Sequence, residues 1–126
     1  MKRLWLGICV LALLLASGFA VTCFMERCHD PISRELAQAA RAALAEDWDG
    51  ALTAESAARA QWGRCRDFTA AFCDHSVLEE MDGLFAQAEV YAAGRDPLSF
   101  AATCAYLSSL ADAVARSHLP NWQNLL

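Results

Sequence analysis

The chain has 126 residues, is 56% hydrophobic, and carries 15 acidic against 10 basic side chains, which gives a formal net charge of −5. A negative balance argues against nucleic acid and anionic lipid surfaces as electrostatic partners. About a hundred residues follow an apolar opening stretch, which is enough for one compact domain and too few for two.

An uninterrupted apolar run covers residues 4–25. A helix that rises about 1.5 Å per residue extends over roughly 33 Å in these 22 residues, which matches a hydrocarbon core about 30 Å thick. The run therefore predicts a transmembrane helix over residues 4–25, in contact with membrane lipid.

The charges on either side of this run differ. Lys2 and Arg3 precede it, whereas the arginine that follows it is offset by neighbouring acids. The positive-inside tendency predicts that residues 1–3 stay in the cytoplasm and that residues 26–126 are exported from the cell membrane. The exported part holds all fifteen acidic residues and eight of the ten basic ones, a formal charge of −7.

A cleaved signal peptide is the competing interpretation of the same run. Residues 4–16 would be its apolar core, and Gly18 and Ala20 are small residues placed like those before a cleavage site. A retained anchor is favoured because residues 21–25 extend the apolar stretch to spanning length.

Small residues share one side of the predicted span. At 100° per residue they form a face on which another helix could approach closely in lipid. Random scatter of small residues in an alanine-rich chain is the alternative. The possible helix-packing face consists of Cys9, Ala12, Ala16, Ala20 and Cys23.

The exported part is predicted to be helical, because helix-forming residues dominate and β-branched residues are sparse. The first helix begins near Pro31, a residue suited to an opening turn, and ends around Glu46. After an acidic corner, the second helix runs from about Asp49 to Cys73.

The third helix starts at Ser76, which with a glutamate three residues later has the pattern of a capping box, and Gly94 is placed to stop it. The fourth is capped by Asp96, opens at Pro97 and ends before Pro120.

Apolar positions at helical spacing predict the buried face of each helix. The expected core residues are Ile32, Leu36, Ala40, Ala43 and Leu44; Leu52, Ala58, Trp62, Cys65, Thr69 and Phe72; Leu78, Met81, Leu84, Phe85, Ala88, Tyr91 and Ala92; and Phe100, Cys104, Leu107, Ala111 and Val114.

The predicted fold class is all-α. The corners after the first and third helices look alike, each a short acidic turn between helices, so the four helices should form two antiparallel hairpins. Neither hairpin could bury its apolar side alone, which predicts a four-helix bundle or a short solenoid-like array. The apolar tail, residues 120–126, is expected to dock onto the helices.

Four cysteines lie in the exported part, where an oxidising setting permits disulfides. If both bridges form, three pairings are possible. Cys65 and Cys73 cannot pair on one helix, because eight residues separate them by about 12 Å. Cys104 lies on an apolar stripe, as a small hydrophobe would. The state of Cys28 stays open.

No catalytic, cofactor-binding or metal site is predicted. His29, His75 and His118 belong to no Cys-x-x-Cys, His-x-x-x-His or paired Glu-x-x-His pattern. Ser76 lacks a nucleophile elbow and the glycines are scattered, so the chain is not expected to be an enzyme. Trp62 and His75 are either core and corner-ordering residues or the lining of a sensor pocket for a small ligand or metal.

Several segments resemble one bacterial family. They are residues 46–52, 72–76, 78–81 and 124–126, of which the most specific are the Asp-Trp-x-x-Ala-Leu corner and the Asp-His-Ser-x-Leu-Glu junction. Together with the basic start and the span, they resemble domain of unknown function 4363, a family of short, N-terminally anchored helical proteins of Gram-positive bacteria.

The resemblance covers essentially the whole chain and implies a Gram-positive cell-envelope setting, with a partner among other membrane proteins. It brings no known activity or catalytic residues. The four exported cysteines depart from the family, whose members usually carry fewer of them. Our hypothesis is a single-pass, non-catalytic scaffold or interaction module for another envelope protein; the alternatives are an extracytoplasmic sensor and a freely secreted domain.

Overall fold

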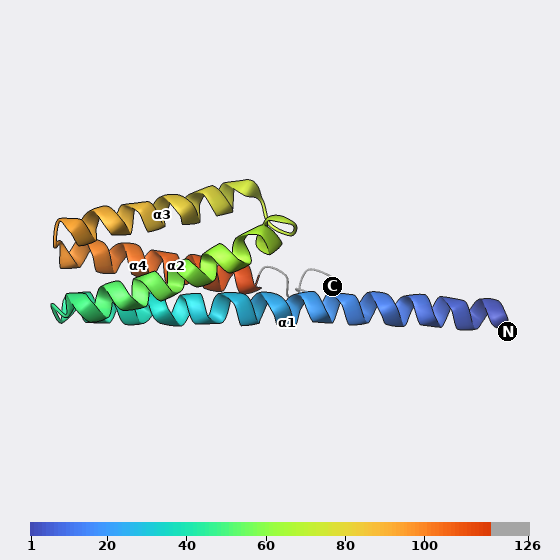
Figure 1. The fold of residues 1–126 in the computed structure, drawn as a ribbon. Coiled ribbons are helices and arrows are strands. Elements are labelled where there is room, and N and C mark those ends of the chain that lie inside the picture. The colour runs from blue at the N-terminus through green and yellow to red at the C-terminus, as the bar shows by residue number, and fades with distance from the viewer. Residues whose placement is uncertain (117–126) are drawn as a thin grey trace, which may run out of the picture.

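A computed structural model describes residues 1–116 of the chain. These residues form four helices, α1 (Lys2–Leu44), α2 (Trp48–Ala70), α3 (His75–Ala93) and α4 (Pro97–Arg116), as Figure 1 shows. The all-α prediction is confirmed. The predicted docking of the tail, and His118, lie outside the described residues.

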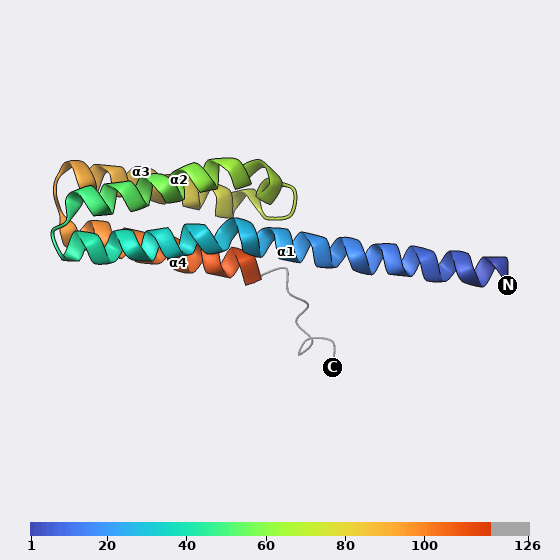
Figure 2. The ribbon, with the colours of Figure 1, turned by 60° about the horizontal axis from the view of Figure 1, so that its bottom comes forward.

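The helices form two antiparallel hairpins that pack on each other as a bundle. Helix α1 contacts α4 and α2 extensively, α3 packs on α4, and α2 and α3 touch less than these pairs do. The contacts therefore support a bundle over a solenoid-like array. Figure 2 shows the apolar half of α1 extending alone from one end of this bundle. The largest fully buried side chains are Phe100, Met25, Ile32, Leu36, Leu78, Met81, Leu107, His29, Thr69, Cys65 and Cys104.

The expected helix boundary at Pro31 is wrong. Helix α1 runs without a break from the apolar run into the bundle, and Pro31 lies inside it. An interior proline lacks an amide donor and costs about 3 kcal/mol relative to alanine. Met25, Cys28 and Ile32 are buried on one face across this site, so packing on both sides of the proline offsets its cost.

Both corners at the far end of the bundle use the same backbone device. Glu46 and Arg95 adopt left-handed φ values of 60° and 53°, and Asp47 and Asp96 follow as N-caps that accept hydrogen bonds from the amides of the third residues after them. Gly94 ends α3 with φ −78°, so the left-handed residue is Arg95 and not the glycine. The predicted likeness of the two corners is therefore present in their geometry.

Aromatic contacts join these two corners. The rings of Trp48 and Phe100 lie 5.6 Å apart edge to face, and the guanidinium of Arg95 lies 5.3 Å from the Trp48 ring centre. Since Trp48 opens α2 and Phe100 lies in the first turn of α4, this cluster fixes one hairpin against the other.

One expected helix cap and three expected core positions need correction. The N-cap of α3 is Asp74, which accepts a hydrogen bond from the Ser76 amide, so Ser76 is not the cap. Leu44, Leu52 and Phe72 were expected in the core but are 57%, 37% and 46% exposed. Leu44 is the last residue of α1 and Phe72 lies beyond the end of α2, whereas Leu52 lines an open groove between α2 and α3.

Candidate functional site

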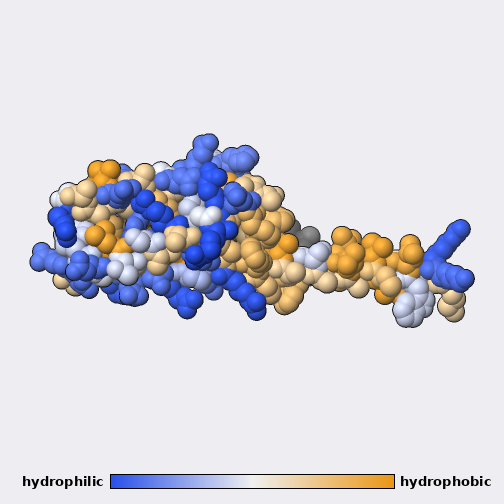
Figure 3. Space-filling view, viewed as in Figure 1, coloured by the Kyte–Doolittle hydropathy of each residue, from blue (hydrophilic) through white to orange (hydrophobic). Residues whose placement is uncertain are grey.

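The first candidate site is the free half of α1. Residues 2–20 are all exposed, and the hydrophobic side chains of this segment form the projecting stalk in Figure 3. By length and composition α1 could cross a membrane, and its most apolar stretch is only 6% buried. Helix α4 meets the same criteria but is a core helix, with 44% of its apolar stretch buried.

The predicted small-residue face points away from the bundle. Cys9, Ala12, Ala16 and Ala20 are exposed and Cys23 is half-buried. On a projection of 100° per residue, this face is centred about 180° from the face that α1 buries in the bundle. Because α1 is continuous, the same face of the helix extends alongside the bundle. In that part the face consists of five exposed residues, Arg27, Asp30, Arg34, Gln38 and Arg41.

We call these ten residues the outward face of α1. Its three arginines are spaced seven residues apart, about 10.5 Å along the axis. Within residues 1–116 no ion pair involves them, whereas Arg59, Arg66 and Arg116 elsewhere in the bundle are ion-paired. The outward face thus combines small side chains in its apolar half with three arginines against one aspartate, a formal charge of +2, in its bundle half.

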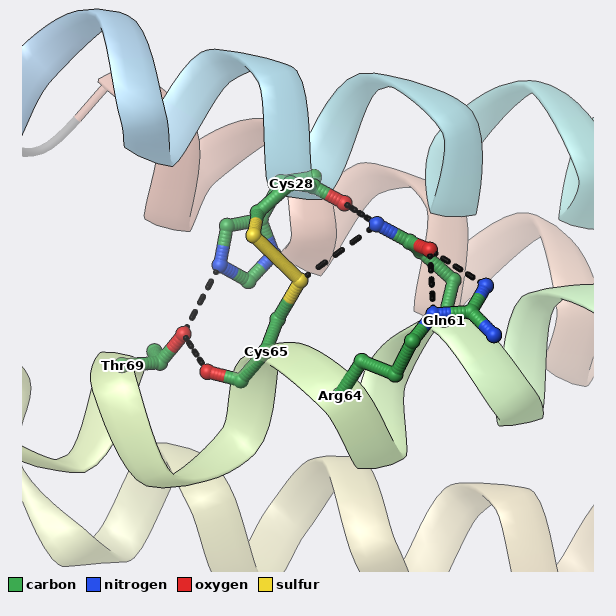
Figure 4. The surroundings of a disulfide bond; sticks show 6 residues. Cys28, Gln61, Arg64, Cys65 and Thr69 are labelled. Atoms are coloured by element: carbon green, nitrogen blue, oxygen red, sulfur yellow. Dashed lines mark hydrogen bonds between the residues drawn. A yellow bond between two sulfur atoms is a disulfide. The ribbon is translucent and has the colours of Figure 1, made fainter.

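A disulfide links the two helices of the first hairpin. Cys28 of α1 and Cys65 of α2 have Cα atoms 6.0 Å apart, and Gln61 donates to the carbonyl of Cys28 at 3.4 Å (Figure 4). Arg64 donates in turn to the Gln61 side-chain oxygen at 2.6 Å. Of the pairings left open by the sequence, this is the one present, and Cys65 and Cys73 do not pair.

Cys104 is fully buried in α4, as expected of a small hydrophobe. Burial, with a smaller effect of Glu55, raises the pKa of its thiol to about 12. A thiol that stays protonated is a poor nucleophile and metal ligand. Cys104 therefore contributes packing and no chemistry.

Sequence reasoning missed the structural role of His29. Its ring is fully buried, and its Nε2 lies 3.1 Å from Thr69 Oγ1. The Thr69 hydroxyl donates to the Cys65 carbonyl at 2.8 Å, so Nε2 must be the donor to Thr69. His29 lies four residues after Met25, on the stripe that α1 buries. That spacing was the available signal, hidden by the expected helix start at Pro31.

Trp62 and His75 do not share a site. Trp62 is 3% exposed in α2, where its indole N–H donates to Asp82 at 2.7 Å, and His75 is exposed at the start of α3. Arg66 also donates to Asp82, at 2.9 Å. Burial opposes ionisation of Asp82, but the hydrogen bonds from Arg66 and Trp62 outweigh it and hold the pKa of this carboxyl below its ordinary value.

A groove of about 690 Å³ runs between α2 and α3, two helices with few contacts between them. Arg59 bridges it, pairing with Glu55 at 2.9 Å and with Glu89 at 3.0 Å, and it donates to the Phe85 carbonyl at 2.8 Å. Among the residues that line the groove, Arg59 and Arg95 balance Glu55 and Glu89 in formal charge. The groove therefore has no net charge to offer a ligand, and among residues 1–116 no cluster of three His, Cys, Asp or Glu could hold a metal.

Comparisons with known proteins add no relative. No family model, no curated protein and no solved structure matches this chain.

The disulfide should be a main source of stability. The Cys28→Ala, Cys65→Ala double variant is expected to lose about 4 kcal/mol of unfolding free energy in detergent, because the bridge closes a loop with a sequence separation of 37. A reductant should lower the native chain to the same level and leave the double variant unchanged. Cys9→Ala, at an exposed thiol, is the matched control. Equal stability of native and double-variant chains would contradict the assignment.

Asp82 should stabilise the α2–α3 contact in a pH-dependent way. Asp82→Ala is expected to cost about 1–2 kcal/mol at pH 7, because it leaves the buried Trp62 N–H without an acceptor. Asp82→Asn, which retains an acceptor, should cost less. Since the folded pKa is depressed, the carboxylate contributes stability above its ordinary value of about 3.9 and loses it as pH falls through the folded pKa. The native chain and the Asp82→Asn variant should differ in denaturant midpoint at pH 7, and this difference should disappear in acid. A difference that does not change with pH would refute this role.

Proposed function

We propose that this chain is a single-pass membrane protein whose non-catalytic helical domain binds another membrane protein of the cell envelope. One observation carries the proposal. A single helix is exposed over residues 2–20, apolar from residue 4 onward, and forms one wall of a bundle over its remainder. A helix of this kind needs lipid around its first half.

Two features support an orientation with the N-terminus in the cytoplasm and the bundle outside. Lys2 and Arg3 flank the apolar half at its start, as the positive-inside tendency requires. The Cys28–Cys65 disulfide lies just beyond the other end, and such bridges persist in oxidising compartments. The resemblance to domain of unknown function 4363 adds a Gram-positive setting to this proposal.

The outward face of α1 is the docking surface that we propose. Hydrophobic exclusion does not drive helix association in lipid, so association there depends on close packing. The small residues of this face allow a second helix to approach closely enough for such packing. Beyond the membrane, Arg27, Arg34 and Arg41 favour a partner with acidic side chains at matching heptad spacing. A second copy packed in parallel would place arginine against arginine, so a different protein fits this face better.

The proposed sidedness can be measured with an impermeant maleimide. Gln87→Cys places an exposed thiol on α3, and Lys2→Cys places one before the apolar run. In intact protoplasts the first variant should gain a label relative to the native chain, and the second should gain one only after lysis. The reverse pattern would overturn the orientation, and a labelled chain in the medium that lacks its first twenty residues would favour the secreted alternative.

The docking face can be mapped by photo-crosslinking in cells. A photoreactive phenylalanine at Ala16 or at Gln38 should capture one common protein, because both positions lie on the outward face. The same group at Gln87 on α3, an exposed position away from α1, is the matched control. Arg34→Glu with Arg41→Glu should reduce the adduct formed from position 16 several-fold. Adducts of equal yield from all three positions would argue against a specific face.

A further inference from the structure

Three phenylalanine rings form a ladder at the end of the bundle where α1 leaves it. The Phe24 ring of α1 lies 4.1 Å from Phe68 near the end of α2, and Phe68 lies 5.0 Å from Phe72 in the α2–α3 corner. Phe24 and Phe72 are 45% and 46% exposed. The three rings therefore form an apolar surface that extends from α1 across the end of α2 to the α2–α3 corner.

The length of α1 places this ladder against the bilayer. Residues 4–22 rise about 28 Å, close to the thickness of a hydrocarbon core of about 30 Å. The apolar run nevertheless continues to Met25, which is fully buried in the bundle, while residues 21–23 are half-buried. The outer boundary of the hydrocarbon thus falls at the level where the bundle begins, and Figure 1 shows the α2–α3 corner at that level.

The surface at this end has matching chemistry. Figure 3 shows hydrophobic residues covering the end of the bundle that faces the stalk, in contrast to the largely hydrophilic sides. A groove of about 500 Å³ opens there, and Phe72, Val77 and Leu110 are among the residues that line it. Aromatic and aliphatic side chains of this kind are stabilised where headgroups meet acyl chains.

We propose that the α2–α3 corner of this protein is embedded in the outer interfacial layer of the same bilayer that α1 spans. The inference rests on the proposed anchoring by α1 and goes beyond it, because it adds a lipid contact from a segment about fifty residues further along the chain. The bundle is then held to the membrane at two points, the helix and the corner. Two points of contact fix the tilt of the bundle and prevent the protein from rotating about the axis of α1.

Lipid quenching of an introduced tryptophan tests this directly. The full chain is reconstituted in phosphatidylcholine vesicles whose acyl chains carry bromine at a shallow or a deep carbon. Phe72→Trp should add fluorescence, relative to the native chain, that shallow bromine quenches most strongly. Leu98→Trp is the matched control: it lies at the opposite end of the bundle, is 73% exposed, and should respond only to an aqueous quencher.

The outcomes separate this inference from the anchor. If the vesicles carry the protein on flotation but position 72 responds like position 98, the embedded corner is refuted and the anchor stands. If the protein does not float with vesicles, both fail. Val77→Trp, in α3, should show the same shallow quenching, so the test does not depend on one variant folding correctly. Circular dichroism checks the helix content of each variant.

Discussion

The structure depends on the continuity of α1 through Pro31. A break there would separate the apolar half from the bundle by a hinge, and the orientation of one would say nothing about the other. The buried stripe on both sides of the proline keeps the helix whole. The two halves therefore share one orientation. The face that carries small side chains in the apolar half also carries the arginines beside the bundle.

The second hairpin depends on this helix as well. Helix α1 has the most extensive contacts of any element, with α4 and α2, whereas α2 and α3 have few contacts and are joined by polar bridges from Arg59, Trp62 and Arg66. The disulfide to α2 lies near the point where α1 leaves the bundle, and the Trp48 cluster closes the opposite end. The bundle is thus fastened at both ends and is more open between α2 and α3.

The sequence predicted the fold class and the four helical segments after residue 25, because apolar spacing and the Asp96 cap are local signals. It failed at Pro31, since a proline suited to an opening turn is locally indistinguishable from one tolerated inside a buried helix. It also left the pairing of Cys28 open, because that depends on the register of α1 against α2. His29 shows the same limit: its buried bond to Thr69 joins residues 40 apart in the chain.

Because α1 is one continuous helix, its exposed arginines beside the bundle all lie on the same side of the protein. An acidic bundle should avoid anionic surfaces, yet α1 carries a row of exposed arginines on the side opposite the core. The phenylalanine ladder starts from the same helix but extends toward α2, away from that row. The proposed lipid contact of the corner and the proposed partner docking would therefore use different sides of the bundle. A partner on the outward face could bind without displacing the corner, and the corner would hold that face at a constant angle to the membrane.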